Sequence, residues 1–415
     1  MPGGVVEDDG TGEWCFGVTL AGNEMEQKHD FIPFIHVLRG LAPLLVVWSH
    51  LAGWWFFVNS SSPLIWTWYQ QLIVDPLRLC YGGGHLGVVL FFCISGYIIS
   101  HVATHERRIE FVVKRIFRLA PVLFVAVALM ALLAELSQLL GLPKMLGNEA
   151  VHLRDYIVTA FLLNYIIDRK PLTLGGVTWS LGSEVIFYAL VTALIPLMRG
   201  RPIMATWMMT AAATALVLPW PSSDALAYAC YFSIYLPLFI IGRIFYLEHT
   251  KQLDSHTALT MVGANAGLLC LLYSFRWPGK LTEAPTEPAV TYFMAIILFY
   301  IVMRTPIRTM PRSVRFFADI SYSLYLVHLP AGSFAMAAVS ALGAPRPIIL
   351  IAGLCAAVGA ATAISRFVER PCQALGRHLL RNAASLLEGL PCRFLPKASD
   401  SIDAPVDDAG APYRW

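Results

Sequence analysis

The sequence has 415 residues, of which 57% are apolar and only 14% are Asp, Glu, Lys or Arg, whereas soluble globular chains contain about 45–50% and about 25% of these types. So much apolar surface cannot be buried in a water-soluble core, and the small, dispersed net charge of +3 argues against a nucleic-acid partner. The eight cysteines are scattered without metal-ligand spacing, which predicts neither a disulfide framework nor a metal site.

Apolar runs that can form membrane helices recur along the chain. Residues 1–30 carry several acids and lack the pattern of a signal peptide, so they are expected to form a cytoplasmic N-terminal segment. A span of the bilayer needs about 20 residues. The run at 156–167 is too short and predicts a re-entrant or interfacial segment. The other ten runs begin near residues 34, 86, 119, 178, 203, 226, 257, 289, 316 and 346.

Basic residues predict the topology, because Lys and Arg of short loops gather on the cytoplasmic side. Clusters at 107–118, 304–315 and 366–381 all fall on that side if ten runs span and the run at 156–167 does not. We therefore predict an all-α, polytopic protein of the cell membrane with about ten transmembrane helices and both termini in the cytoplasm. Its membrane domain covers 31–372, and the tail of 373–415 is expected to be cytoplasmic and largely disordered.

The first span contains two ionisable residues, Arg39 and His50, eleven residues apart. On an α-helix this spacing places both within about 20° of one face and about 16 Å apart in depth. Buried ionisable groups are expensive in lipid, so they indicate a functional site. An imidazole suits a general base because it titrates near neutral pH. The alternative is that His50 only hydrogen-bonds a neighbouring helix while Arg39 extends to the interface.

Basic residues follow the glycine-rich second span, which also carries Ser95. Arg115 and Arg118 lie at i and i+3 on one helical face where the chain re-enters the membrane. Fixed cations at this mouth can bind the phosphates of a nucleotide-bearing donor. An ordinary cytoplasmic basic cluster explains the same residues, and the glycines are typical of close helix packing.

Further polar residues lie in the later spans. Glu184 is embedded between Trp179 and Tyr188 and needs a partner, either a basic side chain or a polar substrate. Ser321, Tyr325 and His328 fall at i, i+4 and i+7 and form one polar stripe. At the end of the last span, Glu369 and Arg370 suggest an interfacial ion pair.

These segments, in this order, resemble acyltransferase family 3, the ten-span membrane acyltransferases that modify bacterial surface sugars and some small molecules. The matching stretches are LRGLAPLLVVWSH, GGHLGVVLFFCISGYIIS, FVVKRIFRLAP, VTWSLGSEVIFY, ISYSLYLVHLP and FVERP. The resemblance implies that Arg39 and His50 are essential and that Arg115 and Arg118 form the basic motif after span two. Glu184 and His328 match two further motif positions. The chain resembles the stand-alone form without an esterase-like domain.

The resemblance also implies the reaction. An acyl-CoA, expected to be acetyl-CoA, would donate an acyl group to a hydroxyl of a carbohydrate such as a lipopolysaccharide, exopolysaccharide or glycolipid. We expect the phosphates on Arg39, Arg115 and Arg118, and the chemistry at His50, Glu184 and His328, without a metal. The sequence leaves open a direct attack on the thioester and a relay through an acyl-enzyme; a G-x-S-x-G nucleophile motif is not seen, which favours direct transfer. Two alternatives stay open: acylation of a secreted, macrolide-like molecule, and transport of an acylated sugar or lipid.

Overall fold

The computed structural model describes residues 32–143, 145–150, 152–168, 173–218, 230–276, 280 and 288–388. The chain divides into a unit made of its two ends, Met1–Pro33 with Leu395–Trp415, and a unit of Phe34–Phe394. The expected N-terminal segment of 1–30 lies outside the described residues. The described part of the second unit consists of helices joined by turns and loops and contains no strand.

The long helices of the first half of the chain begin close to the predicted positions. They are α1 (Pro33–Trp48, continued by the π-helical turn η2, Ser49–Trp54, and by α2, Trp55–Asn59), α4 (Gly84–Ala103), α5 (Arg108–Leu139) and α8 (Trp179–Gly200). α5 starts well before residue 119, because its first turns are polar and extend beyond the apolar run. The short helices α3 (Leu64–Tyr69), α6 (Leu153–Ala160) and α7 (Asn164–Ile167) lie between them.

The second half contributes six further long or apolar helices. They are α9 (Pro202–Val217), α11 (Leu236–His249), α12 (Ser255–Arg276), α13 (Pro288–Arg304), α15 (Ser321–Val327, continued by η6, His328–Gly332, and α16, Ser333–Ala341) and α17 (Arg346–Ile364, continued by η7, Ser365–Glu369, and α18, Arg370–Glu388). α14 (Arg312–Asp319) precedes α15. The predicted start of the tail at residue 373 falls within α18, and 389–415 lie outside the described residues.

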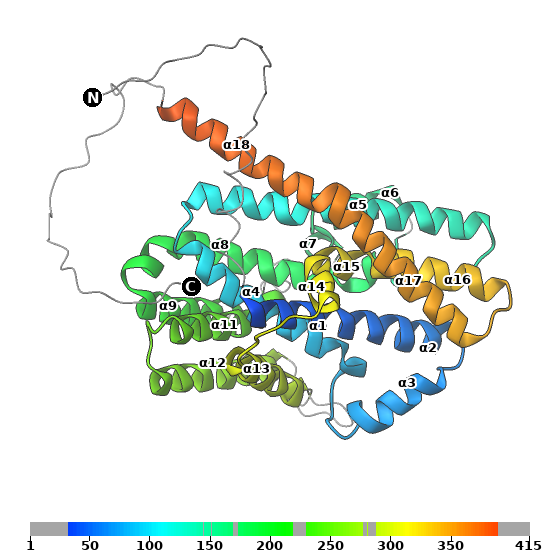
Figure 1. The fold of residues 1–415 in the computed structure, drawn as a ribbon, viewed down its shortest axis with the longest axis horizontal. Helices are drawn as coiled ribbons and strands as arrows, with labels where there is room; N and C mark the ends of the chain where they lie inside the picture. Colours follow the sequence, from blue (N-terminus) through cyan, green and yellow to red (C-terminus); the bar gives the residue numbers. More distant parts are fainter. Residues whose placement is uncertain are drawn as a thin grey trace, which may run out of the picture. The chain divides into compact units, whose positions relative to one another are not determined.

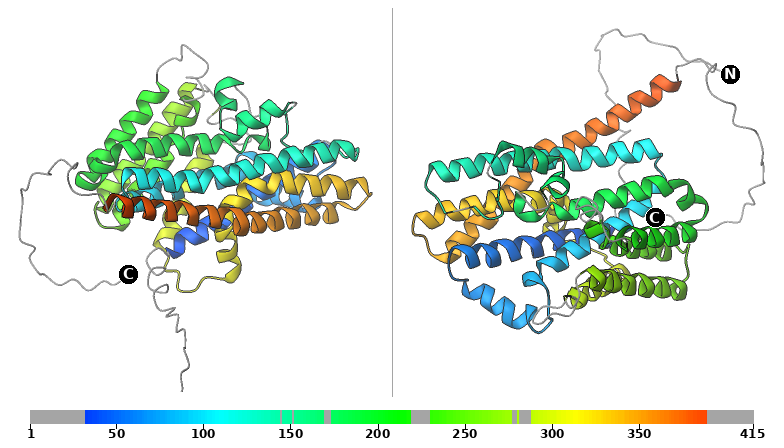
Figure 2. Two further views of the ribbon diagram at one scale, coloured as in Figure 1. Left: turned by 90° about the horizontal axis from the view of Figure 1, so that it is seen from above. Right: turned by 180° about the vertical axis from the view of Figure 1, so that it is seen from behind.

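The helices confirm a polytopic membrane protein. In the described part of the chain, eight continuous helical segments are long and apolar enough to cross a membrane, and two shorter apolar helices, Pro202–Val217 and Pro288–Arg304, add to them. These ten coincide with the ten predicted spans. The segment 156–167 instead falls in α6 and α7, of 8 and 4 residues, which are too short to span. The long helices run side by side (Figures 1 and 2).

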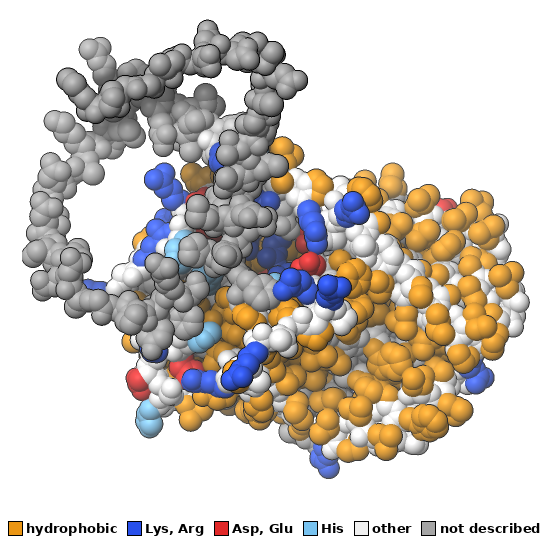
Figure 3. Space-filling view, in the orientation of Figure 1, with side chains coloured by type: hydrophobic (Ala, Val, Ile, Leu, Met, Phe, Trp, Pro, Cys, Tyr) orange, Lys and Arg blue, Asp and Glu red, His pale blue; other side chains and the backbone are white. Residues whose placement is uncertain are grey.

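Basic side chains join the helices at one end. Arg199 at the end of α8 donates hydrogen bonds to the carbonyls of Ala103, at 3.3 Å, and of Glu106, at 2.5 Å. Arg304 of α13 pairs with Glu248 of α11. Figure 3 shows a broad apolar surface over the right part of the molecule, with most of the visible Lys and Arg on the other part. We call this the basic end of the helices; the predicted topology assigns it to the cytoplasm.

The helices α4 and α11 pack against each other more extensively than any other pair of described helices. The backbone of Gly96 stands directly against Phe239, and that of Gly242 against Cys93. A Cβ atom at either glycine would overlap backbone atoms of the partner helix. The glycines predicted to permit close packing thus include Gly96, and this contact fixes α4 against α11.

We predict that Gly242→Leu destabilises the fold, because the side chain has no space beside Cys93. Overpacking of this kind costs about 1–3 kcal/mol. Gly359→Leu is the matched control, since no atom lies within 4 Å of the Cβ position in that transmembrane helix. Thermal unfolding of the purified proteins in one detergent measures both. Equal midpoints for the two variants would contradict this packing.

Candidate active site

The central contact of the site joins two histidines from distant spans. Nδ1 of His50, in η2, lies 2.8 Å from Nε2 of His328, the first residue of η6. The two rings lie nearly parallel, with an interplanar angle of 7° and centroids 5.1 Å apart. His328 is completely buried. We call these residues the imidazole pair.

Hydrogen bonds to the backbone determine which nitrogens carry protons. Nδ1 of His328 lies 2.8 Å from the carbonyl of Tyr325 and 3.1 Å from that of Leu324. A carbonyl only accepts, so Nδ1 of His328 is the protonated nitrogen. Nε2 of a neutral His328 must then accept the proton of His50 Nδ1–H. This arrangement leaves the lone pair on Nε2 of His50, which is the position that a general base requires.

Both histidines sit in wide π-helical turns, which are frequent at functional sites. Pro330 lies within η6 and has no backbone N–H, so a regular helical hydrogen bond is lost there. The loss widens the turn and gives His328 its position facing η2. The η2 turn contains Gly53, whose Cα is covered by the ring of Trp66.

A glycine-rich turn covers the imidazole pair. Gly175 stands against the side chains of Leu329, the neighbour of His328, and of Trp54, whose ring lies 5.7 Å from that of His50. Its N–H bonds to the carbonyl of Gly147 at 2.6 Å. Both glycines have positive φ, +60° and +74°, and their Cα atoms are too close for side chains. Glycine is therefore required at both positions.

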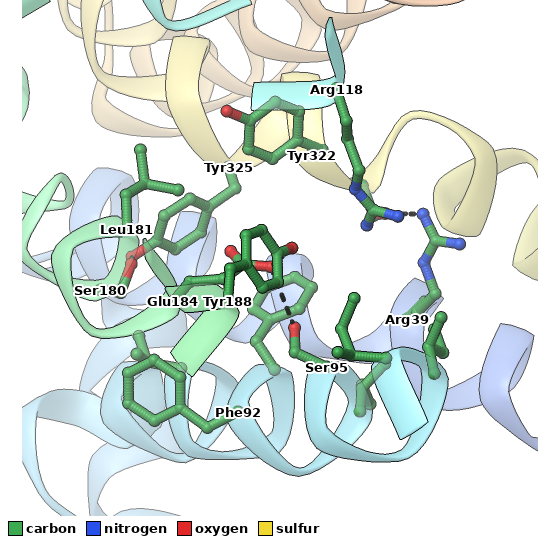
Figure 4. Close-up of a pocket in the computed structure, with 16 residues that line it drawn as sticks. Arg39, Phe92, Ser95, Arg118, Ser180, Leu181, Glu184, Tyr188, Tyr322 and Tyr325 are labelled. Atoms are coloured by element: carbon green, nitrogen blue, oxygen red, sulfur yellow. Dashed lines mark hydrogen bonds between the residues drawn. The ribbon is translucent and has the colours of Figure 1, made fainter. Parts of the chain in front are cut away.

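A pocket between α1, α4, α5, α8 and α15 lies on the basic side of the imidazole pair. Figure 4 shows Arg39 and Arg118 pointing toward one another at one side of it. Its volume of about 60 Å³ is room for a few water molecules. The polar residues that line it are Arg39, Ser95, Arg118, Ser180, Glu184, Tyr188, Ser321, Tyr322 and Tyr325.

The two arginines share the pocket with Glu184, but neither is held by a close ion pair with it. Arg39 donates a hydrogen bond to Ser321 at 3.3 Å. Glu184 instead accepts hydrogen bonds from Ser95, at 3.3 Å, and from Tyr188. Among the described residues, no carboxylate forms an ion pair within 4.0 Å of either Arg39 or Arg118. Two facing guanidinium groups without such a partner make a favourable site for an anion.

The predicted ion pair between Glu369 and Arg370 is wrong. Glu369 is buried and accepts a hydrogen bond from Ser323 at 2.6 Å, whereas Arg370 is exposed and pairs with Asp319 at 3.4 Å. Glu369 closes the π-helical turn η7, and Pro371 follows Arg370, so the two neighbouring side chains point to opposite sides. Glu369 thus adds a negative charge near the arginine pocket.

The predicted basic motif is divided by the structure. Arg118 lines the pocket, but the guanidinium of Arg115 lies 4.0 Å from Glu106 and over the ring of Phe111, with 5.5 Å to its centroid. Lys114 also pairs with Glu106, at 3.0 Å, and with Glu110, at 2.6 Å. Arg115 and Lys114 are therefore held by acids outside the pocket.

The two predicted polar stripes face each other. Arg39 and His50 of the first span contact Ser321 and His328, which are the two ends of the stripe on α15. Tyr325 lies between them. Its ring lines the pocket, and its backbone carbonyl accepts a hydrogen bond from His328. Sequence reasoning missed the partners Ser323 and Ser180, and it missed His85, a histidine in the first turn of α4; a polar residue inside an apolar span was the available signal for each.

The described residues contain no group of three His, Cys, Asp or Glu that is able to hold a metal ion. The described residues place an imidazole pair at one level of the bundle and a pocket with two arginines, Arg39 and Arg118, at another. Such a combination, inside a bundle of membrane helices, fits the transfer of a group from an anionic donor.

The family comparison agrees with this arrangement. Residues 32–366 match the family model of the acyltransferase 3 type, described as an acyltransferase domain. The chain therefore belongs to this family and is a multi-pass, membrane-bound acyltransferase that requires an acyl donor.

Two proteins with related sequences are similar to the chain. BcsY of Komagataeibacter xylinus, whose name describes it as a membrane-bound transacylase, is 26% identical over 334 residues, which cover 73% of this chain and 75% of BcsY. Nodulation protein 10 of Rhizobium leguminosarum bv. viciae is 28% identical over 175 residues, 39% of this chain and 44% of that protein. No solved structure matches the chain.

We predict that Ser323→Ala destabilises the protein more than Arg370→Gln. The first removes a hydrogen bond to a buried carboxylate, which costs about 1.5–3 kcal/mol. The second breaks an exposed ion pair, which contributes at most about 1 kcal/mol. Denaturation of both variants in the same detergent compares them. A larger loss for Arg370→Gln would show that Glu369 is not held as described.

Proposed function

We propose that the protein transfers an acetyl group from acetyl-CoA to a hydroxyl group of a carbohydrate. The observation that carries the proposal is the arrangement along α15: an imidazole pair at one end and a pair of facing arginines at the other. The name of BcsY, a transacylase, supports the transfer reaction. A carbohydrate acceptor is the substrate class that the resemblance of the sequence motifs implies.

The spacing of the two sites suits coenzyme A. Arg39 and His50 are separated by about 16 Å along the first span, and Ser321 and His328 by about 10 Å along α15. The pantetheine arm, from its phosphate oxygen to its sulfur, is about 14 Å long when extended, by analogy with a peptide chain. Phosphates held by Arg39 and Arg118 would thus place the thioester beside His50. The pocket side chains must move apart to admit the arm.

The proposed chemistry is a direct transfer. Nε2 of His50 takes the proton of the acceptor hydroxyl, whose oxygen attacks the thioester carbonyl. The carbon–sulfur bond of the tetrahedral intermediate then breaks, and the imidazolium of His50 gives its proton to the departing thiolate. His328 positions the ring of His50 and shares its positive charge through the 2.8 Å contact. Glu184 holds Ser95 and Tyr188 on the donor side of the pocket.

We predict that His50→Ala lowers the rate of label transfer from acetyl-CoA at least about a hundredfold, the contribution of a general base. His328→Ala should also lower kcat, and the double variant should be no slower than His50→Ala because the two residues act as a unit. The assay uses purified protein in detergent, where no proton gradient exists. His105→Ala, an exposed histidine at the basic end, is the control. Full activity of folded His50→Ala would refute the base.

We also predict that Arg118→Gln raises the KM for acetyl-CoA at least about tenfold, since a lost hydrogen bond to a charged group costs about 1.5–3 kcal/mol. Arg115→Gln is the matched control, because its guanidinium pairs with Glu106 outside the pocket. Its KM should change much less. Equal increases would indicate that phosphates bind along the whole basic motif rather than at the arginines of the pocket.

A further inference from the structure

A second group of polar side chains lies at the ends of the helices opposite the basic end. It is aromatic and comes from five separate segments of the chain. We call it the outer aromatic cluster: His85, Trp179, Tyr231, Tyr235, Tyr273 and Tyr292. His85 and Trp179 are in the first turns of α4 and α8, so the cluster surrounds the ends at which these helices begin.

The rings of the cluster are arranged around His85. The ring of Trp179 is stacked on it, with centroids 6.1 Å apart and an interplanar angle of 23°. Tyr292 lies 5.7 Å and Tyr235 6.2 Å from the same imidazole, by ring centroids. Trp179 and Tyr235 are 4.9 Å apart. The cluster therefore presents several flat rings together with hydroxyl and imidazole groups.

Ordinary packing does not explain the polarity of this cluster. Aromatic residues that anchor a membrane protein at the interface point toward the lipid headgroups. Tyr235 and Tyr292 instead face the interior, with exposures of 4% and 2%, and their rings pack with centroids 6.4 Å apart. Burying such groups in a bundle costs free energy that Phe or Leu would avoid. Polar aromatic side chains in an interior position indicate a polar ligand.

Two contacts connect the cluster to the imidazole pair. Gly84 of α4 packs directly against Ser49 of the first span. His85 is the residue after Gly84 and His50 is the residue after Ser49, so this contact brings the two histidines to the same region. Ser180 bonds to the hydroxyl of Tyr325 at 2.8 Å, and Tyr325 gives its carbonyl to His328. Trp179 precedes Ser180. In addition, Phe92 packs on Trp179 and lines the arginine pocket.

The loop of residues 59–85, which is also rich in Trp, Tyr and Gln, is less suitable for stacking on a sugar ring. Trp66 of this loop covers Gly53 and Gly82, and its ring packs 6.4 Å from that of Trp48. Trp68 is 60% exposed on the surface of α3, as expected for a residue that meets lipid. The aromatic groups of the loop thus stabilise the first span or face outward, whereas the outer aromatic cluster is linked to the imidazole pair by the contacts of Gly84 and Ser180.

We propose that the outer aromatic cluster is the subsite for the sugar ring of the acceptor. The inference rests on the proposed acetyl transfer to a carbohydrate and names the residues that select this substrate class. The apolar C–H face of a pyranose ring stacks on Trp179, and ring hydroxyls bond to the Tyr hydroxyls and to His85. The bound ring then directs one hydroxyl toward Nε2 of His50, while the donor enters from the arginine pocket.

The test compares each sugar ring with an open chain that carries similar hydroxyls. The probes are the methyl glycosides of glucose, galactose and mannose, each against its alditol (sorbitol, galactitol and mannitol). Binding is titrated calorimetrically to the full-length protein in detergent without donor, and transfer from labelled acetyl-CoA is followed separately. The variants are Trp179→Leu and Trp179→Phe. Trp207→Leu is the control, because Trp207 is exposed near the start of α9 at the basic end.

The wild type should bind at least one glycoside in preference to its alditol. Trp179→Leu should weaken glycoside binding and raise the acceptor KM at least about fivefold, the magnitude of a lost aromatic stacking contact. Trp179→Phe should retain part of the glycoside binding that Trp179→Leu loses. The KM for acetyl-CoA and acceptor-independent thioester hydrolysis should stay unchanged in both variants, which a merely structural defect would not allow.

Two results would overturn the subsite. One is that no glycoside binds better than its alditol; the other is that Trp179→Leu weakens glycoside and alditol equally or changes the KM for acetyl-CoA. Failure of the proposed function has a different signature. The wild type would then bind a glycoside through Trp179 but would release no coenzyme A.

Discussion

The contact between His50 and His328 is the interaction on which the account of the site depends. Neither ring can remain without a partner inside a helix bundle surrounded by lipid, because a polar group there loses its hydrogen bonds to water. The two rings satisfy each other, and the carbonyls of Leu324 and Tyr325 fix the proton on the far side of His328. The chain thereby keeps a basic nitrogen in the membrane without burying a charge in the resting state.

The helix packing supports this contact from several sides. Close glycine contacts hold α4 against the first span and against α11, and the turn of Gly147 and Gly175 covers the imidazole pair. The wide turns η2 and η6 bring the two histidines out of the regular helical register. Helices that are straight and fully hydrogen-bonded would give less freedom to orient a side chain. The site thus lies where the backbone is least regular, which is common for functional positions.

Much of the fold was accessible from the sequence. Lipid requires long apolar helices, and the distribution of Arg and Lys excluded the short run at 156–167, so hydropathy and charge predicted the ten apolar helical segments found in the described part of the chain. The polar stripes on the first span and on α15 were also predictable, because each is local to one helix. The contacts of Arg39 with Ser321 and of His50 with His328 depend on which helices pack next to each other. No local sequence pattern encodes this.

The errors and omissions have the same origin. Adjacent residues in a regular helix point about 100° apart, but the turn η7 and the packing of α18 decided that Glu369 faces inward and Arg370 outward. The i and i+3 spacing of Arg115 and Arg118 predicted that both side chains share one face of the helix. In the structure Glu106, which precedes the helix, pairs with Arg115, whereas Arg118 lines the pocket. The aromatic cluster around His85 assembles from segments as distant as α4 and α13, so only the three-dimensional structure brings it together.

The central claim is that donor and acceptor reach the imidazole pair from opposite ends of the helices. It is tested most directly in proteoliposomes that contain the protein in one known orientation, with labelled acetyl-CoA on one side and a glycoside acceptor on the other. The account predicts transfer only when acetyl-CoA is on the side of the basic end and the acceptor is on the opposite side, with the acetylated product remaining there. Equal transfer with both substrates supplied on the basic side would contradict it.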